Sequence, residues 1–285
     1  CASGQVGRQI LSILGSNNVV PTSRHPLAPG WIALHLGVLE PAEAEDLVGG
    51  LAVDAVYCVG GATDVEGCES APDRAMRANC GGPATLAAAA ALHKLPFVYF
   101  STDYIFDGKA GPYAEEAPAN PINAYGRSKW NGELAVRLAH PNALILRTTV
   151  VYGVDPGARN FLYALDRALR TGGVFRVPND QISTPTYNVD LAAAAVGLVA
   201  AKASGIFHVC GAERLSRFDF ALRAAAAMGL DMSNVVGAPT SELGQRAPRP
   251  LEAGLCTDKL RRLFPNLRMR GVEESIRNWM FTDRL

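Results

Sequence analysis

Apolar runs and amphipathic stretches alternate along the first half of the chain. Apolar runs of strand length, rich in β-branched and aromatic residues, predict strands at residues 18–22, 31–36, 54–59, 97–101 and 143–148. Segments between them predict helices at residues 4–14, 41–48, 71–92 and 125–139, the third with a break near residues 81–83. Apolar strands that alternate with helices are typical of a parallel sheet covered on both faces. The pattern therefore predicts a doubly wound α/β fold.

Beyond residue 153 the predicted strands and helices alternate less regularly. Short strands are expected at residues 174–177 and 205–209, and helices at residues 161–170, 189–203, 218–228 and 272–280. This pattern predicts a smaller α/β lid that covers the sheet and binds substrate. We expect one domain from residues 1–153 plus about 186–206, and the lid from about 154–185 plus 207–285.

Glycines surround the start of the first predicted helix, in the segment Gly4, Gln5, Val6 and Gly7. Glycine lets the backbone approach a pyrophosphate, and the helix N-terminus offers unpaired N–H groups. An ordinary glycine turn before a helix is the alternative. A dinucleotide-binding turn follows a buried strand, and Cys1 stands where a first glycine is expected. We therefore expect a further strand before residue 1.

The predicted strand at residues 18–22 leads directly to Arg24. An acidic residue at this point binds the ribose 2′-hydroxyl of NAD, whereas an arginine suits the 2′-phosphate of NADP. The first acidic residue of the chain is Glu40. The sequence thus favours NADP(H), with NAD(H) as the alternative cofactor and a solvated surface arginine as the alternative role of Arg24.

The aromatic strand at residues 97–101 ends in Ser101, Thr102 and Asp103. Ligands of open α/β sheets bind beyond the carboxyl ends of the strands, so these side chains are expected to face a binding crevice. A locally capped turn would also explain three such residues in a row.

Tyr125 and Lys129 are four residues apart on a predicted helix and therefore share one face. An ammonium beside a phenol favours the phenolate and lowers the tyrosine pKa. Such a tyrosine is a proton donor or acceptor usable near neutral pH.

Composition excludes several classes of function. The formal net charge is +0 and the pI is about 7.1, so no electrostatic argument supports binding to nucleic acid or to anionic membranes. The Ala-rich apolar stretch at residues 84–92 is too short to span a bilayer. The six cysteines lack metal-ligand spacing and the five histidines are scattered, so we expect no metal and reduced thiols in a cytoplasmic protein.

The run STDYIFDGKAGPYAEEAPANPINAYGRSKWNGELAV at residues 101–136 resembles the short-chain dehydrogenase/reductase superfamily. Within it, the chain is similar to the dTDP-4-dehydrorhamnose reductase branch, which also holds the regulatory β subunit of methionine adenosyltransferase. The segments CASGQVG (1–7), LRTTVVYG (146–153), DQISTPTYNVDLA (180–192) and RPLEAGLCTDKL (249–260) fit the same branch. The resemblance implies a Rossmann-type fold and NADPH-dependent reduction of a nucleotide-linked sugar.

The resemblance also implies roles for individual residues. Tyr125 would protonate the developing alkoxide, Thr102 would hydrogen-bond the same oxygen, and Lys129 would lower the Tyr125 pKa and hold the nicotinamide ribose. The implied cofactor-binding residues are Gly4, Gln5, Val6, Gly7, Arg24, Gly60, Gly61, Ser101, Tyr125 and Lys129. The implied substrate-binding residues are Asp103, Tyr104, Asn160, Thr184 and Tyr187. For the last three, a satisfied structural polar group is an equal alternative. Asn79 matches a position that supports this kind of site structurally.

At three positions the chain differs from the residues usual in this branch, so the resemblance does not identify the substrate. Gly60 and Gly61 follow Val59 where the branch usually has Asn-Ala-Ala, Gly37 replaces an Asp near the adenine, and Val150 replaces a Trp near the sugar. Two functions therefore remain. One is a 4-ketoreductase acting on a nucleotide-linked deoxysugar, as in dTDP-rhamnose biosynthesis. The other is a non-catalytic, NADP-binding regulatory subunit of a partner enzyme; a second copy of the chain is the alternative partner.

Overall fold

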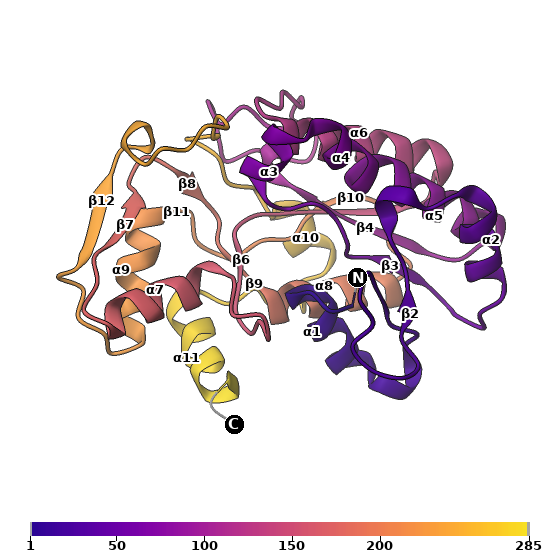
Figure 1. Ribbon diagram of the computed structural model, residues 1–285, viewed down its shortest axis with the longest axis horizontal. Helices are drawn as coiled ribbons and strands as arrows, with labels where there is room; N and C mark the ends of the chain where they lie inside the picture. The colour runs from indigo at the N-terminus through magenta and orange to yellow at the C-terminus, as the bar shows by residue number, and fades with distance from the viewer. Residues whose placement is uncertain (1, 284–285) are drawn as a thin grey trace.

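Four parallel strands form the main sheet of the computed structural model, which describes residues 2–283. The strands are β3 (Val56–Cys58), β4 (Phe97–Thr102), β5 (Leu144–Thr148) and β10 (Gly205–His208), in the order β10-β5-β4-β3. Every residue of β5 and all but one of β4 are buried, because helices cover both faces of the sheet (Figure 1). The predicted doubly wound α/β fold is confirmed.

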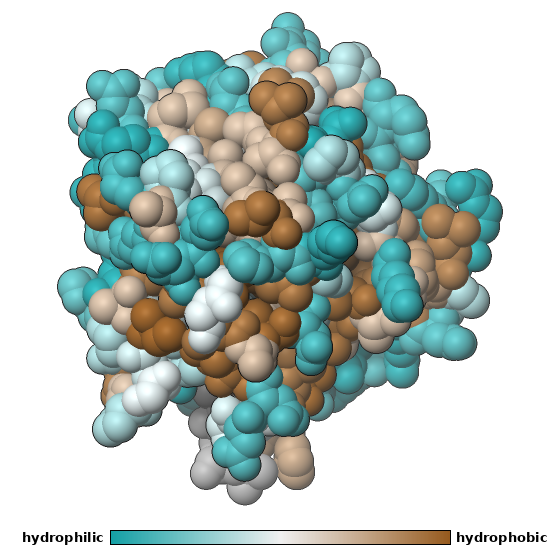
Figure 2. Space-filling model, turned by 90° about the vertical axis from the view of Figure 1, so that its right-hand side faces the viewer, coloured by the Kyte–Doolittle hydropathy of each residue, from teal (hydrophilic) through white to brown (hydrophobic). Residues whose placement is uncertain are grey.

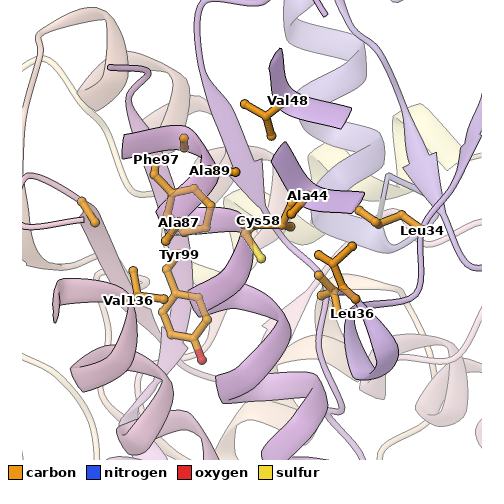
Figure 3. Packing of buried hydrophobic residues seen from close by; sticks show 14 of the residues in the cluster. Leu34, Leu36, Ala44, Val48, Cys58, Ala87, Ala89, Phe97, Tyr99 and Val136 are labelled. Carbon is orange, nitrogen blue, oxygen red and sulfur yellow. The ribbon is translucent and has the colours of Figure 1, made fainter. Parts of the chain in front are cut away.

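The two faces of the sheet are covered by different helices. α2 (Pro41–Gly49), α5 (Gly82–Leu92) and α6 (Ala124–Ala139) enclose a core that includes Phe97 and Tyr99 of β4 (Figure 3). The intervening Val98 lies in the opposite core, beneath α8 (Asn188–Ala200). The alternation follows from the two-residue period of a strand. Full burial of each large apolar side chain contributes about 1.5–3 kcal/mol to folding.

The chain before β3 forms a separate small sheet. It contains only β1 (Thr22–Ser23) and β2 (Ile32–Ala33), paired in parallel, and α1 (Gln5–Leu14) precedes it. Both strands are shorter than predicted. Residues Ser16–Asn18 form a 3-10 turn, which shortens the first of them.

The predicted helix at residues 71–92 is not broken at Pro83. α3 (Val65–Ser70) and α4 (Pro72–Met76) lead into a π-helical turn at Arg77–Gly81, which continues directly into α5. Pro83 has no N–H to donate to the Asn79 carbonyl four residues earlier, and that carbonyl accepts the Tyr99 hydroxyl at 2.6 Å instead.

The second half of the chain forms short strand pairs around an aromatic core. The helices that contribute to this core are α7 (Phe161–Arg170), α9 (Arg217–Ala227) and α11 (Val272–Asp283), on the left of Figure 1. The strand pairs are β7 (Phe175–Pro178) with β12 (Val235–Ala238), β8 (Ile182–Ser183) with β11 (Leu215–Ser216), and β6 (Val151–Tyr152) with β9 (Thr186–Tyr187).

One expected domain limit differs from the structure. The limit between residues 206 and 207 falls inside β10, which pairs with β5 as far as His208. α10 (Asp258–Leu263) also places Leu260 in the core of the main sheet. β10 thus joins the main sheet by pairing with β5, and α10 joins it by packing against the same core.

A buried ion pair joins α6 to the main sheet. Arg147 on β5 and Glu133 on α6 are 2% and 0% exposed, and the Nη2–Oε2 distance is 2.8 Å. Ser101 on β4 donates to Glu133 Oε1 at 2.5 Å, and Arg147 Nη1 donates to the Glu115 carbonyl at 2.9 Å. The Glu115 carboxylate in turn accepts the His208 N–H of β10. Such charge-assisted hydrogen bonds fix direction as well as distance.

We predict that Glu133→Gln lowers the free energy of unfolding by about 3 kcal/mol or more, because the Arg147 guanidinium would remain buried without its counter-charge. Urea denaturation measures this loss. The matched control is Glu242→Gln, which breaks an exposed pair with Arg176 and should cost less than about 1 kcal/mol. Equal, small losses in both variants would contradict a structural role of the buried pair.

Candidate functional site

The start of α6 meets the end of β4, and this contact brings Tyr125 to Thr102. The Thr102 hydroxyl caps the turn after β4 by accepting the Tyr104 N–H at 3.2 Å. Asn123 caps α6 by accepting the Gly126 N–H at 2.8 Å. A Cβ at Gly126 would lie 2.1 Å from the Tyr104 carbonyl oxygen, so only glycine permits this approach. As a result, the hydroxyls of Tyr125 and Thr102 lie close enough to influence each other.

Burial decides the protonation of Tyr125. It raises the pKa of Tyr125 well above the ordinary tyrosine value; the neighbouring Thr102 hydroxyl opposes this rise, while Asp103 and Tyr104 add to it. The Tyr104 ring lies edge-on to Tyr125, with ring centroids 5.5 Å apart. The expected lowering of this pKa by Lys129 is not observed, because burial dominates. Tyr125 is therefore a neutral phenol, the form that can donate a proton.

Lys129 lies one helical turn after Tyr125 and is buried, whereas Tyr125 is partly buried. Its Nζ donates to the Phe100 carbonyl at 2.5 Å and lies 4.0 Å from the centroid of the Tyr99 ring. Burial lowers the pKa of Lys129 to about 8, although Cys58 and Glu133 act in the opposite direction. An ammonium has three N–H donors, so the bond to Phe100 leaves capacity for ligand hydroxyls.

Asp103 and Arg217 add opposite charges to the same region. Asp103 is 1% exposed, and burial raises its pKa to about 6, against the opposing effect of Arg217. Arg217 begins α9, and its guanidinium carbon lies 5.5 Å from the centroid of the Phe161 ring. The sequence analysis missed Arg217. Nothing in its local pattern separates it from a surface arginine, and only the fold brings α9 to the end of β4.

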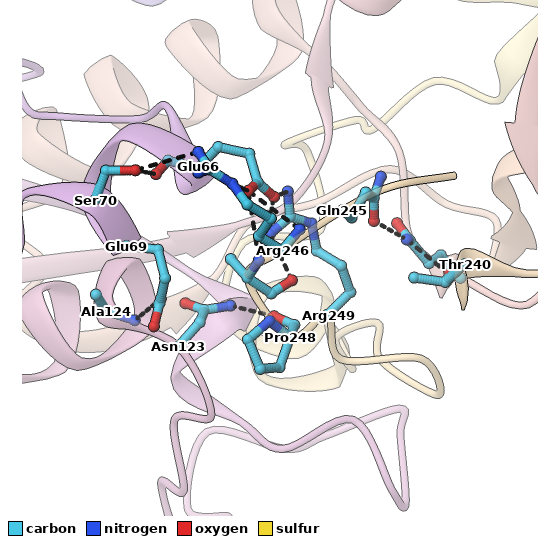
Figure 4. Close-up of polar contacts among 12 residues, drawn as sticks. Glu66, Glu69, Ser70, Asn123, Ala124, Thr240, Gln245, Arg246, Pro248 and Arg249 are labelled. Carbon is cyan, nitrogen blue, oxygen red and sulfur yellow. Dashed lines mark hydrogen bonds and ion pairs between the residues drawn. The ribbon is translucent and has the colours of Figure 1, made fainter. Parts of the chain in front are cut away.

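A loop at residues 245–249 connects the lid to the main sheet beside the start of α6 (Figure 4). Glu66 of α3 accepts the Arg249 Nη2–H at 2.8 Å and the Arg246 backbone N–H at 3.2 Å. Asn123 donates its side-chain amide to the Pro248 carbonyl at 2.8 Å. The loop is thus tied to α3 and to the N-terminus of α6, next to Tyr125.

The turn before α1 fits the phosphates of a dinucleotide. Gly4 caps α1 with an extended backbone and no side-chain hydrogen bond, so no side chain occupies the N-terminus of the helix. The Ser3 and Ser23 hydroxyls lie 2.9 Å apart and tie this turn to β1. Arg24 follows β1 directly and is exposed, and its predicted contact with a 2′-phosphate stays a prediction.

Gly60 and Gly61 follow β3 at the same edge of the sheet. A Cβ at Gly61 would lie 2.6 Å from Asn79 Oδ1, so the backbone can pass close to this side chain. Asn79 accepts the Ala62 N–H at 2.7 Å and donates to the Ser128 hydroxyl at 2.9 Å. Asn79 therefore connects the loop after β3 to α6, which is a structural role.

Four predicted ligand residues make hydrogen bonds within the protein. Asn160 caps α7 through the Leu162 N–H and donates to the Gln5 side chain at 3.0 Å. The Thr184 hydroxyl accepts the Leu255 N–H at 3.3 Å. Tyr187 is 1% exposed and donates to Asn278 Oδ1 at 2.9 Å. Ser101, as described above, donates to Glu133. Structural hydrogen bonds thus account for these side chains, and their ligand roles stay predictions.

The backbone is strained where β5 ends. Val150 has φ 43°, in the left-handed region that β-branched residues avoid. Such a conformation costs about 1–3 kcal/mol and is typical of ligand-binding sites. Rhamnose-forming members of the dTDP-4-dehydrorhamnose reductase branch have a tryptophan at the position of Val150. The strained backbone and this difference in sequence therefore occur at the same residue, just after β5.

Among residues 2–283 no cluster of three or more His, Cys, Asp or Glu side chains is arranged to hold a metal ion. The cysteines described there, at positions 58, 68, 80, 210 and 256, are free thiols. In the same part of the chain, every helix is too short or too polar to cross a membrane.

Solved structures share this architecture. A dTDP-4-dehydrorhamnose reductase of Clostridium acetobutylicum is 30% identical with a TM-score of 0.87, covering 100% of this chain and 98% of that one. A dTDP-4-dehydrorhamnose reductase of Bacillus anthracis in complex with NADP is 28% identical with a TM-score of 0.87, covering 99% and 96%.

Sequence comparison gives the same result. A probable low-salt glycan biosynthesis reductase of Haloferax volcanii is 33% identical over 257 residues, 87% of this chain and 85% of the relative. A dTDP-4-dehydrorhamnose reductase of Sinorhizobium fredii is 35% identical over 237 residues, 79% of each chain. The family model for the RmlD substrate binding domain matches residues 1–280. The resemblance drawn from the motifs is therefore confirmed, and the chain belongs to the RmlD substrate-binding-domain family.

Proposed function

We propose that this protein is an NADPH-dependent reductase of the 4-keto group of a nucleotide-linked deoxysugar, similar to dTDP-4-dehydrorhamnose reductase. The observation that carries the proposal is the position of Tyr125, at the start of α6, beside Thr102 at the end of β4, with buried Lys129 one turn further along α6. The reductase names of the relatives and the NADP bound to the Bacillus anthracis structure support it.

Thr102, Tyr125 and Lys129 each have a separate role in the proposed reaction. NADPH, when bound, supplies a hydride to the carbonyl carbon. Tyr125 is protonated and donates its proton to the oxygen on which negative charge develops. Thr102 donates a hydrogen bond to the same oxygen. Lys129 hydrogen-bonds the nicotinamide ribose through its buried ammonium, and the N-terminus of α1 with Arg24 holds the phosphates.

The substrate is held between the sheet and the lid. The Arg217 guanidinium has the shape and charge to bind a diphosphate, and Asp103 with Tyr104 can hydrogen-bond sugar hydroxyls. Val150 leaves more room for the sugar than the tryptophan of rhamnose-forming members. Residues 1–153 plus about 186–206 would bind the cofactor, and the lid would bind the nucleotide sugar. The proposal places this activity in the cytoplasm, in a single chain or a homodimer.

We predict that Tyr125→Phe lowers kcat at least about 100-fold, because the alkoxide loses its proton donor, and leaves the Kd for NADPH within about twofold. The assay follows loss of nicotinamide absorbance with enzymatically generated dTDP-4-keto-6-deoxy sugar. The control is Tyr113→Phe, whose hydroxyl donates to Asp107 on a surface loop and should leave kcat unchanged. A Tyr125→Phe variant that keeps most of its rate would exclude this residue as the donor. Tight NADPH binding without turnover by the unaltered protein would favour the regulatory function.

Arg24→Ala tests cofactor preference. Loss of the charge-assisted hydrogen bond should raise the Kd for NADPH about tenfold and change the Kd for NADH less than twofold. Fluorescence titration with both cofactors measures the two values, and Arg176→Ala is a control at an exposed arginine of the lid. Equal losses for NADPH and NADH would remove the proposed contact with the 2′-phosphate.

Asp103→Asn tests whether the buried Asp103 carboxyl has a raised pKa, through the pH dependence of stability. The pKa of Asp103 is about 6 in the folded protein, above its ordinary 3.8, so the folded state binds the extra proton between these values. The contribution of this group to the free energy of unfolding is therefore greatest at low pH. It falls by about 3 kcal/mol as the pH rises from about 4 to about 6. Urea denaturation from pH 4 to 7 should show that Asp103→Asn removes this loss. A pH-independent difference between the two proteins would contradict the raised pKa.

A further inference from the structure

The first residue of α1 makes side-chain hydrogen bonds to the strand and the helix that lead into the lid. Gln5 Nε2 donates to the Val151 carbonyl of β6 at 3.3 Å, and Gln5 Oε1 accepts the side-chain N–H of Asn160, before α7, at 3.0 Å. The same Asn160 amide also donates to the Gly153 carbonyl at 2.8 Å. Gln5 thus forms a bridge between the glycine turn before α1 and the β6–α7 loop, residues 153–160.

The rest of α1 contacts its surroundings largely through apolar side chains. Ile10, Leu11 and Leu14 line an apolar gap beside β3, together with Val196 of α8. Figure 2 views the molecule from the right-hand side of Figure 1 and shows a brown, hydrophobic band between polar surfaces. Burial of apolar surface stabilises a contact without fixing its direction. The hydrogen bonds of Gln5 therefore set how the start of α1 is aligned with the lid.

The β6–α7 loop has a backbone conformation that depends on its anchors. Gly153 has φ 120° and Ala158 has φ 48°, both in the left-handed region. Asp155 closes the loop by accepting the Gly157 and Arg159 N–H groups, each at 3.0 Å. The side of the loop that carries Gly157 and Arg159 is exposed. An exposed turn with such a backbone persists only where surrounding contacts hold it, and the bridge supplies contacts at both ends.

Gln5 also belongs to the turn that fits the phosphates of a dinucleotide. Gly4 caps α1 without a side-chain hydrogen bond, so the backbone N–H groups at the start of the helix, including that of Gln5, can bind an anion. A pyrophosphate bound there would fix the backbone of Gln5 and, through the bridge, the β6–α7 loop. The loop continues into α7, whose Leu162 and Leu165 lie in the core of the lid.

We propose that Gln5 and Asn160 are positioning residues that couple dinucleotide binding to the order of the β6–α7 loop. The inference rests on the proposed function, because it takes NADP(H) as the ligand of the glycine turn. The bound dinucleotide stabilises the bridge, and the bridge stabilises the loop and the start of α7. The nucleotide sugar then meets a lid that is already ordered, so its binding costs less entropy. Because such coupling is reciprocal, the nucleotide sugar also tightens binding of the dinucleotide.

Amide exchange in the loop, measured by NMR with NADP+ as the only ligand, tests this coupling. Saturating NADP+ should slow exchange of the Gly157 and Arg159 N–H groups at least about fivefold, because their bonds to Asp155 break when the loop opens. Gln5→Met keeps the length of the side chain but removes its hydrogen bonds. Asn160→Ser keeps a capping hydroxyl for α7 but is too short to reach Gln5. In both variants, each saturated according to its own Kd, NADP+ should change exchange less than about twofold.

The matched control is Asn18→Ser, at the other end of α1. Asn18 donates to the Leu14 carbonyl at 2.9 Å, and its replacement should preserve the full response to NADP+. NADP+ that binds the unaltered protein without slowing exchange would overturn the coupling and leave the reductase proposal intact. Slowing that persists in Gln5→Met and Asn160→Ser would also overturn it, because the dinucleotide would then act on the loop directly. Failure of the unaltered protein to bind NADP+ would contradict the proposed function itself, and the coupling with it.

Discussion

The buried pair of Arg147 and Glu133 sets the position of α6 against the sheet, and the candidate site depends on that position. Arg147 belongs to β5 and Glu133 to α6, and the Ser101 hydroxyl adds β4 to the same hydrogen-bonded group. α6 carries Tyr125 and β4 ends at Thr102, so the geometry that orders the core also brings these two side chains together. An apolar replacement of similar volume could be equally stable but would not fix the rotation of α6 in this way.

Burial then adjusts the chemistry of the groups that this geometry assembles. It keeps Tyr125 protonated, lowers the pKa of Lys129 to about 8 and raises that of Asp103 to about 6. The ammonium and the carboxyl therefore both move toward neutral pH, in opposite directions. One physical cause, removal from water, thus acts on the proton donor and on two of its neighbours.

Much of the main sheet could be predicted from the sequence because its signals are local. The apolar runs that became β4 and β5, and the helix that carries Tyr125, lie within a residue or so of their predicted limits. The two-residue strands of the lid were missed because they contain too few residues to show a period. The pairing of β10 with β5 was missed because it joins segments far apart in the sequence.

Some residues of the candidate site could be predicted from the sequence and others could not, again because only local signals can be read from it. Tyr125 and Lys129 could be recognised from their spacing on one helix, and Thr102 from its place at the end of an aromatic strand. Arg217 reaches the site only through the folding of the lid, and Ser101 is directed toward Glu133 by a partner 32 positions away. The sign of the Tyr125 pKa shift also depends on burial by the whole fold. None of these can be read from neighbouring residues.

An isotope experiment tests the reductase assignment most directly. The protein is incubated with enzymatically generated dTDP-4-keto-6-deoxy sugar and with NADPH that carries deuterium at the transferable position of the nicotinamide, prepared as each of the two epimers. Product analysis by mass spectrometry and NMR should find one deuterium, at C4 of the sugar, from one epimer and none from the other. NADPH that binds tightly while no deuterium reaches the sugar would contradict a catalytic function of the Thr102 and Tyr125 pair.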